Sequence, residues 1–160
     1  MHHFERQAQF MDLCKLPRHK LKTIIVDGML TNPAFLQQVT LWMRLINEEV
    51  NIELRSHLNN LLAQPVGYLM QKEEERLTFV TLLADDIIDS VYVIDGLSNL
   101  FGLPRHELFY EVHRTNLAKA QIDKEGNIIV MRRADGKIIK PAGWQSPNLK
   151  SIIEAHIHID

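Results

Sequence analysis

A long amphipathic pattern, from Pro33 to about Ala63, constrains the fold more than any other feature of the sequence. Apolar side chains such as Leu41, Leu45 and Ile52 recur at three- and four-residue intervals, as on one face of an α-helix. The helix should begin at Pro33, because Asn32 suits the N-cap position and proline suits the first helical position. The sequence therefore predicts a long helix here.

Two other segments of the first hundred residues show helical patterns. The first runs from Phe4 to Cys14 and should end before Pro17, which lacks a backbone donor. The second begins with the polar run "QKEEERL", whose glutamates we assign to solvent, and continues to Gly102, where we expect it to stop.

A fourth helix is predicted after Pro104, with Phe109, Val112 and Leu117 on its apolar side. Beyond it the short β-prone runs "NIIVM" and "KIIK" alternate with glycine-containing turns, which indicates a small hairpin or an ordered arm. The final stretch "LKSIIEAHIHID" is compatible with a short helix or a strand.

Length and pattern together favour an all-α fold in a single domain over residues 1–160, with a helical core over about 33–120 and a C-terminal arm over about 121–160. The net charge of -2 supplies no basic field for binding nucleic acid. The sequence shows neither a secretory signal nor a membrane span. Because Cys14 is the one cysteine, a reducing, cytoplasmic location is expected.

Acidic residues interrupt both long helical patterns. Glu48, Glu49 and Glu53 border the apolar stripe of the first, and Asp86 and Asp89 lie three residues apart on the second, with Asp85 and Asp95 as outer partners. Carboxylates gathered beside a core persist only when they are protonated, paired with bases or bound to cations. Oxygen ligands favour Mg²⁺, with Mn²⁺ as a second option. The alternative is a solvated acidic face, which is common on helices.

These motifs resemble the all-alpha nucleoside triphosphate pyrophosphatases, the MazG-like superfamily, whose signature is EExxE on one helix and ExxD on the next. Glu48-Glu49 and Asp86-Ile87-Ile88-Asp89 are similar to that signature. The segments "HRTNLAK" and "KPAGW" resemble the tail of a dimeric subgroup that hydrolyses deoxyuridine and related triphosphates. The resemblance covers roughly residues 40 to 150.

The resemblance implies an antiparallel helical bundle completed by a second subunit, as a dimer or possible tetramer. It implies Mg²⁺-dependent hydrolysis of a nucleoside or deoxynucleoside triphosphate to the monophosphate and pyrophosphate. The residues it assigns are Glu48 as the catalytic group that orients or deprotonates water, Glu49, Glu53, Asp86 and Asp89 as metal ligands, and Asn116, Lys119, Lys140 and Trp144 as substrate contacts.

Two positions depart from the family pattern. Asp86 stands where glutamate is usual, and Ile52 occupies the place of the third glutamate, so that Glu53 is displaced by one residue. One residue rotates a helical side chain by about 100° unless a π-bulge absorbs it. The alternatives are therefore a nucleotide-binding protein with a weakened metal site, a phosphoribosyl-ATP pyrophosphohydrolase, or a structural oligomer with intersubunit salt bridges.

Overall fold

The computed structural model describes residues 2–63 and 72–158 and is mostly helical, which confirms the predicted all-α class. Contacts between residues divide the chain into two compact units, Met1–Leu103 and Pro104–Asp160. The boundary lies inside the predicted helical core over about 33–120, so the sequence did not indicate this division. That all 160 residues act as a single domain stays a prediction.

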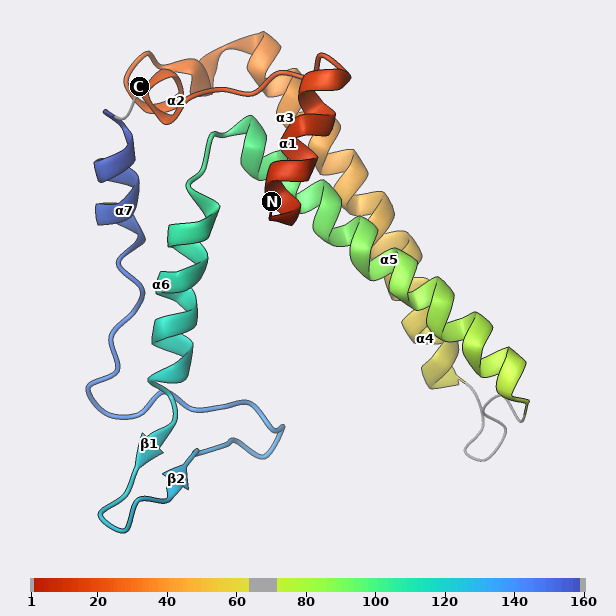
Figure 1. Cartoon of the computed structure of the whole chain (residues 1–160), viewed down its shortest axis with the longest axis vertical. Coiled ribbons are helices and arrows are strands. Elements are labelled where there is room, and N and C mark those ends of the chain that lie inside the picture. The colour runs from red at the N-terminus through yellow and green to blue at the C-terminus, as the bar shows by residue number, and fades with distance from the viewer. Residues whose placement is uncertain (1, 64–71, 159–160) are drawn as a thin grey trace. The chain divides into compact units, whose positions relative to one another are not determined.

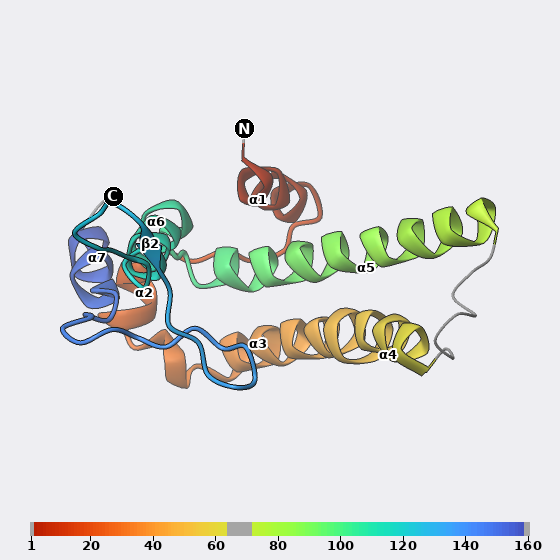
Figure 2. The same ribbon diagram turned by 90° about the horizontal axis from the view of Figure 1, so that it is seen from below.

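One long rod and one long helix dominate the first unit. The elements, in chain order, are α1 (His3–Leu13), α2 (Leu21–Ile25), the 3-10 helix η1 (Met29–Thr31), α3 (Pro33–Ile46), the π-helix η2 (Asn47–Leu54), α4 (Arg55–Ala63) and α5 (Glu73–Leu100). The elements α3, η2 and α4 follow one another without a break and run antiparallel beside α5 (Figures 1 and 2). The predicted long helix is confirmed, but its middle is a π-helix.

The ends of these helices follow from local chemistry. The Asn32 side-chain oxygen accepts hydrogen bonds from the backbone N–H groups of Ala34 at 2.9 Å and Phe35 at 3.3 Å, so the predicted N-cap is confirmed. Gly102 ends the second long helix as predicted, with a φ of 62°. A Cβ atom at Gly102 would lie 2.1 Å from the carbonyl oxygen of His19, so a larger residue does not fit.

The core of the first unit lies between α1, α2, α3 and α5. Its buried members are Met11, Ile24, Phe35, Trp42, Val93 and Leu100. At Gly96 the absence of a side chain lets α5 approach the Trp42 ring, because a Cβ atom there would lie 2.1 Å from two ring carbons. This close approach sets the separation of the two helical rods that carry the acidic residues.

Polar contacts attach α1 to α5. The His3 ring nitrogen Nδ1 lies 2.5 Å from a carboxylate oxygen of Asp95, which is 1% exposed. Asn99 donates from its side-chain nitrogen to the Gln7 side-chain oxygen at 2.7 Å. Burying polar side chains is costly unless hydrogen bonds compensate, so these contacts favour the observed position of α1 on α5.

The second unit contains α6 (Arg105–Leu117), the antiparallel strands β1 (Gln121–Ile122) and β2 (Ile128–Ile129), and α7 (Leu149–His156). The predicted hairpin is present, and a further bridge between Arg132 and Ile138 closes a second turn around Gly136. Residues 149–156 of the ambiguous final stretch form the helix α7. Helices α6 and α7 pack against each other.

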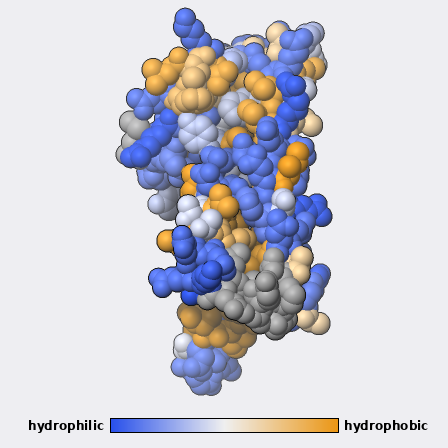
Figure 3. Space-filling view, turned by 90° about the vertical axis from the view of Figure 1, so that its right-hand side faces the viewer, coloured by the Kyte–Doolittle hydropathy of each residue, from blue (hydrophilic) through white to orange (hydrophobic). Residues whose placement is uncertain are grey.

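Large apolar side chains lie on the surface of both units. Phe109 and Leu117 are 68% and 62% exposed, so the predicted apolar side of α6 is not buried in the described residues. On α5, Ile87, Ile88, Val91 and Ile94 are exposed as well. Figure 3 shows apolar residues among hydrophilic ones on one face of the molecule. Among the described residues, no helix combines the length and the hydropathy needed to traverse a bilayer.

Candidate acidic metal site and lysine–tryptophan cluster

Two neighbouring elements of the first unit carry the predicted acidic residues. Glu48, Glu49 and Glu53 lie on η2, and Asp86 and Asp89 lie on α5. The π-helix packs directly against α5, so the two acidic groups come from segments in contact. Asp86 is buried, whereas Glu48, Glu53 and Asp89 are exposed and Glu49 is half-buried.

The π-helix changes the positions of the glutamates relative to an ordinary α-helix. Hydrogen bonding from residue i to i+5 brings residues five apart close to the same face, as i to i+4 bonding does for residues four apart. Glu48 and Glu53 are five apart and lie within the π-helix. Relative to the family pattern, Glu53 is displaced by one residue. The π-helix can absorb such a displacement and bring Glu53 close to the face of Glu48.

An open depression of about 540 Å³ lies beside η2, and Glu49, Asp86 and Asp89 are not among the residues that line it. Its lining includes Glu48 and Glu53 together with Arg44, and Ile52 lies at the same surface. The volume falls in the range of small-molecule sites. A second depression, of about 550 Å³, is lined by residues from the start of α5 and contains none of the predicted site residues, so we attach no function to it.

The pKa of Glu49 responds to the charges of the other four predicted acids. Its pKa is raised above the usual value, first by partial burial and then by four negative charges, which belong to Glu53, Asp89, Glu48 and Asp86. Burial disfavours the ionised form of a carboxyl group, and nearby like charges add to that effect. The acids of η2 and α5 therefore form one electrostatic group.

The side chains of this acidic group do not converge on one point. Within residues 2–63 and 72–158, no three Asp, Glu, His or Cys side chains are close enough together to hold one metal ion. Asp86 accepts a hydrogen bond from the Nδ1 nitrogen of His57 on α4. Asp95, predicted as an outer partner of the acids, is instead bonded to His3 on α1.

The chemistry of the donor set nevertheless fits a hard divalent cation. All five acidic side chains offer carboxylate oxygens, the ligands that Mg²⁺ and Mn²⁺ prefer. Burial and the repulsion from neighbouring carboxylates both raise the pKa of Glu49, and a bound cation would relieve the repulsion. The residues that would hold the cation are Glu49, Glu53, Asp86 and Asp89.

The four predicted substrate contacts are gathered in the second unit. The Lys140 ammonium lies 4.1 Å from the centre of the Trp144 ring and that of Lys119 lies 5.8 Å from it, within the range of cation–π contact. Lys119 also donates to the side-chain oxygen of Asn116 at 2.6 Å. Two positive charges beside an aromatic face suit an anionic ligand that carries a ring.

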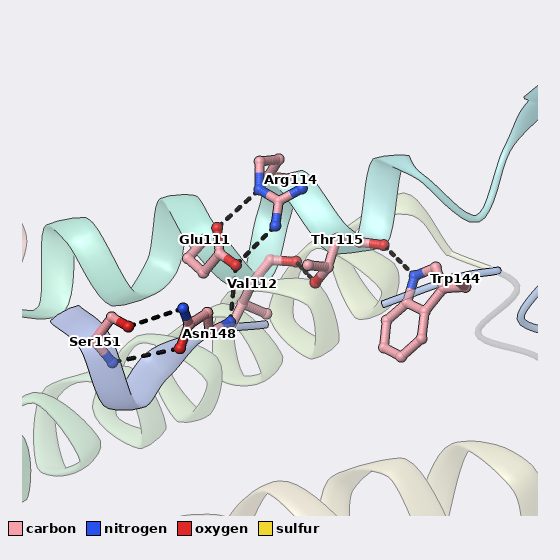
Figure 4. A network of polar contacts seen from close by, with 7 residues as sticks. All are labelled: Glu111, Val112, Arg114, Thr115, Trp144, Asn148 and Ser151. Carbon is pink, nitrogen blue, oxygen red and sulfur yellow. Dashed lines mark hydrogen bonds and ion pairs between the residues drawn. The ribbon is translucent and has the colours of Figure 1, made fainter. Parts of the chain in front are cut away.

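Hydrogen bonds hold Trp144 and the chain that precedes α7 on α6 (Figure 4). The Trp144 indole N–H donates to the Thr115 carbonyl oxygen at 2.7 Å. Glu111 accepts two hydrogen bonds from Arg114 and one from the backbone N–H of Asn148, which fixes the chain at the start of α7. The Arg114 contact and the Asn148 bond lower the pKa of Glu111 to about 2.

Two residues at the acidic group were not identified from the sequence. Arg44 lies one helical turn before Glu48 and contributes a positive charge to the depression. His57 contacts Asp86 from a different helix. A signal for His57 was present, because it follows Glu53 by four residues and therefore lies near it on the helix surface.

In comparisons with known proteins, the chain matches no protein-family model and no curated protein.

Proposed function

We propose that the chain is a metal-dependent nucleoside triphosphate pyrophosphatase of the MazG-like kind. The observation that carries the proposal is the packing of η2 against α5, which brings Glu48, Glu49 and Glu53 beside the helix that carries Asp86 and Asp89. Burial and then the four neighbouring carboxylates raise the pKa of Glu49, as expected for such a group. The resemblance of the motifs in these elements and in the C-terminal tail supports the same activity. A cytoplasmic location is part of the proposal, because Cys14 is the one cysteine.

The proposed reaction cleaves the bond between the α- and β-phosphates with one water molecule and yields a nucleoside monophosphate and pyrophosphate. A bound Mg²⁺ or Mn²⁺ would neutralise charge on the phosphate oxygens and acidify water. Glu48 is exposed at the depression and is the group we assign to orienting water and accepting its proton. Arg44 at the same surface can bind a phosphate oxygen.

The lysine–tryptophan cluster is assigned to the substrate. Lys119 and Lys140 offer ammonium groups for phosphate oxygens, and the Asn116 side chain supplies an amide donor. The Trp144 ring is half-buried and anchored through its N–H, so its orientation is fixed before a ligand arrives. A substrate that combines phosphates with a planar base fits these groups.

We further propose that a second copy of the chain covers the exposed apolar surface of α5, as dimer or tetramer formation would. Ile87, Ile88, Val91 and Ile94 are exposed there although they lie on a central helix of the first unit. Contiguous exposed apolar residues mark interaction surfaces in soluble proteins. Light scattering on the purified chain tests this part of the proposal.

The decisive experiment measures pyrophosphate release from a panel of ribo- and deoxynucleoside triphosphates, with Mg²⁺ and with a chelator. Wild type, Glu49→Gln and the control Glu74→Gln are compared, because Glu74 is an exposed glutamate in the first turn of α5. We expect release that needs Mg²⁺, that falls at least about 100-fold in Glu49→Gln, and that is unchanged in the control. Release that persists with chelator would contradict the proposal.

A second candidate function is nucleotide capture without hydrolysis. One observation favours it, since no three acidic side chains of the described residues converge on a single point. It predicts that a nucleoside triphosphate raises the melting temperature while no pyrophosphate appears under any metal condition. The panel experiment therefore separates the two functions.

A further inference from the structure

A histidine from α4 contacts the most buried member of the acidic group. The Nδ1 nitrogen of His57 donates to the Oδ2 oxygen of Asp86, and the two side chains are 31% and 7% exposed. The contact joins the rod formed by α3, η2 and α4 to α5. Neither the family signature nor the tail motifs assign a role to His57.

Because Asp86 is buried, its hydrogen bond to His57 affects both the stability and the orientation of its carboxylate. Removing a carboxylate from water is costly unless hydrogen bonds compensate it. A hydrogen bond to one oxygen also restricts rotation of the carboxylate, so that the second oxygen keeps a defined direction. Asp86 lies on α5, which packs directly against η2, and its charge has the smallest effect of the four that raise the pKa of Glu49.

We infer that His57 is a positioning residue that holds the Asp86 carboxylate in the orientation required to bind a divalent cation. The inference rests on the proposed function, because it assumes that the acidic group binds such a cation. Hydrogen-bond partners of ligating carboxylates orient their ligands, and losing one typically weakens metal affinity by about 10- to 100-fold. His57 acts through Asp86 and does not touch substrate.

The chain offers matched variants for a test. His57→Leu removes the hydrogen bond. His57→Asn retains it, because the asparagine amide nitrogen occupies nearly the position of Nδ1, whereas His57→Gln places its amide nitrogen near the position of Nε2. The control is His19→Leu, since His19 also makes a side-chain contact between segments, but to the neutral amide of Gln38, at 3.2 Å.

The measurement is Mn²⁺ binding to the nucleotide-free, full-length protein, followed by electron paramagnetic resonance of the free ion. We expect His57→Leu to weaken binding by about 10- to 100-fold and His57→Asn to stay within about threefold of wild type. His19→Leu should bind as wild type does, even if its melting temperature falls. If His57→Leu does not fold, the same contrast is expected between His57→Gln and His57→Asn.

The inference is overturned if the Leu variant binds Mn²⁺ as wild type does, or if the Asn and Gln variants are equally weak. Pyrophosphate release measured in parallel keeps the two proposals apart. Wild type that binds Mn²⁺ but releases no pyrophosphate contradicts the enzymatic proposal, and the variants still decide the role of His57. Wild type that binds no Mn²⁺ overturns both.

Discussion

Substituting Gly96 with alanine tests how closely the two helical rods approach each other. The new Cβ atom would lie 2.1 Å from Cη2 and Cζ3 of Trp42, and 2.7 Å from the Gln7 side-chain nitrogen. Carbon atoms in contact are normally about 3.5 Å apart, so the shortfall is about 1.4 Å. Trp42 is 4% exposed and belongs to the core, so the ring has little room to move away.

The expected loss of stability follows from two opposing effects. Overpacking a core costs about 3 kcal/mol at the upper end of the usual range, which the severity of this overlap justifies. Replacing glycine by alanine inside a helix recovers about 1 kcal/mol. The net loss is therefore about 2 kcal/mol in the free energy of unfolding, or roughly 8–16 °C in melting temperature for a unit of this size.

Urea unfolding of four proteins measures this effect as a double-mutant cycle. The proteins are wild type, Gly96→Ala, Trp42→Phe and the double variant. A phenylalanine ring lacks the outer carbons of the indole, so Gly96→Ala should cost less than about 1 kcal/mol in that background. A loss below about 0.5 kcal/mol in the wild-type background, or equal losses in both backgrounds, would refute the close approach.

Three further predictions concern the acidic group, the network of α6 and the α5 surface. The raised pKa of Glu49 means that its ionisation destabilises the fold as pH rises through that pKa, so Glu49→Gln should raise the urea midpoint at pH 7 in chelator. This gain in stability should vanish below pH 4.5, the ordinary pKa of a glutamate, because Glu49 is then protonated in both the folded and the unfolded state. A lower urea midpoint for Glu49→Gln than for wild type at pH 7 would contradict the repulsion. Glu111 should titrate at a pKa of about 2 by carbon NMR, with its contribution to stability present above 4.5 and lost as pH falls toward 2. A midpoint near 4.5 would show that the Arg114 contact does not form in solution. Ile88→Asp should halve the molar mass in sedimentation without lowering the melting temperature of the monomer, because Ile88 is 63% exposed. An unchanged mass would rule out the α5 surface as the subunit interface.

The parts of the fold that the sequence predicted are those governed by local chemistry. Asn32 and Pro33 mark the start of α3, and Gly102 marks the end of α5, because caps and positive φ angles depend mainly on neighbouring residues. The glycine-containing turns of the C-terminal arm follow the same logic at Gly126 and Gly136.

Features decided by contacts between distant segments could not be predicted in the same way. Spacing predicted an apolar side of α6, but Phe109 and Leu117 are exposed, because spacing does not say what covers a face. The short helix α2 was not predicted, since five residues carry too little periodicity. The division after Leu103 depends on which segments pack together.

The candidate site shows the same limit. The sequence singled out the acids of η2 and α5, and the electrostatics of Glu49 now connect them. The bond from His57 to Asp86 depends on how α4 lies against α5, which no spacing within one helix reveals. The roles of Glu48, Lys119 and the other assigned residues stay predictions.

The π-helix also bears on how this chain and its relatives can differ in length. A single residue inserted into an α-helix would turn everything beyond it by about 100°, whereas a π-helix contains the insertion within about two turns. Relatives with one residue fewer between Asn47 and Leu54 would form an uninterrupted α-helix and present the same faces of α3 and α4. The π-helix is therefore the point of the rod at which one residue can be gained or lost while α3 and α4 keep their orientation.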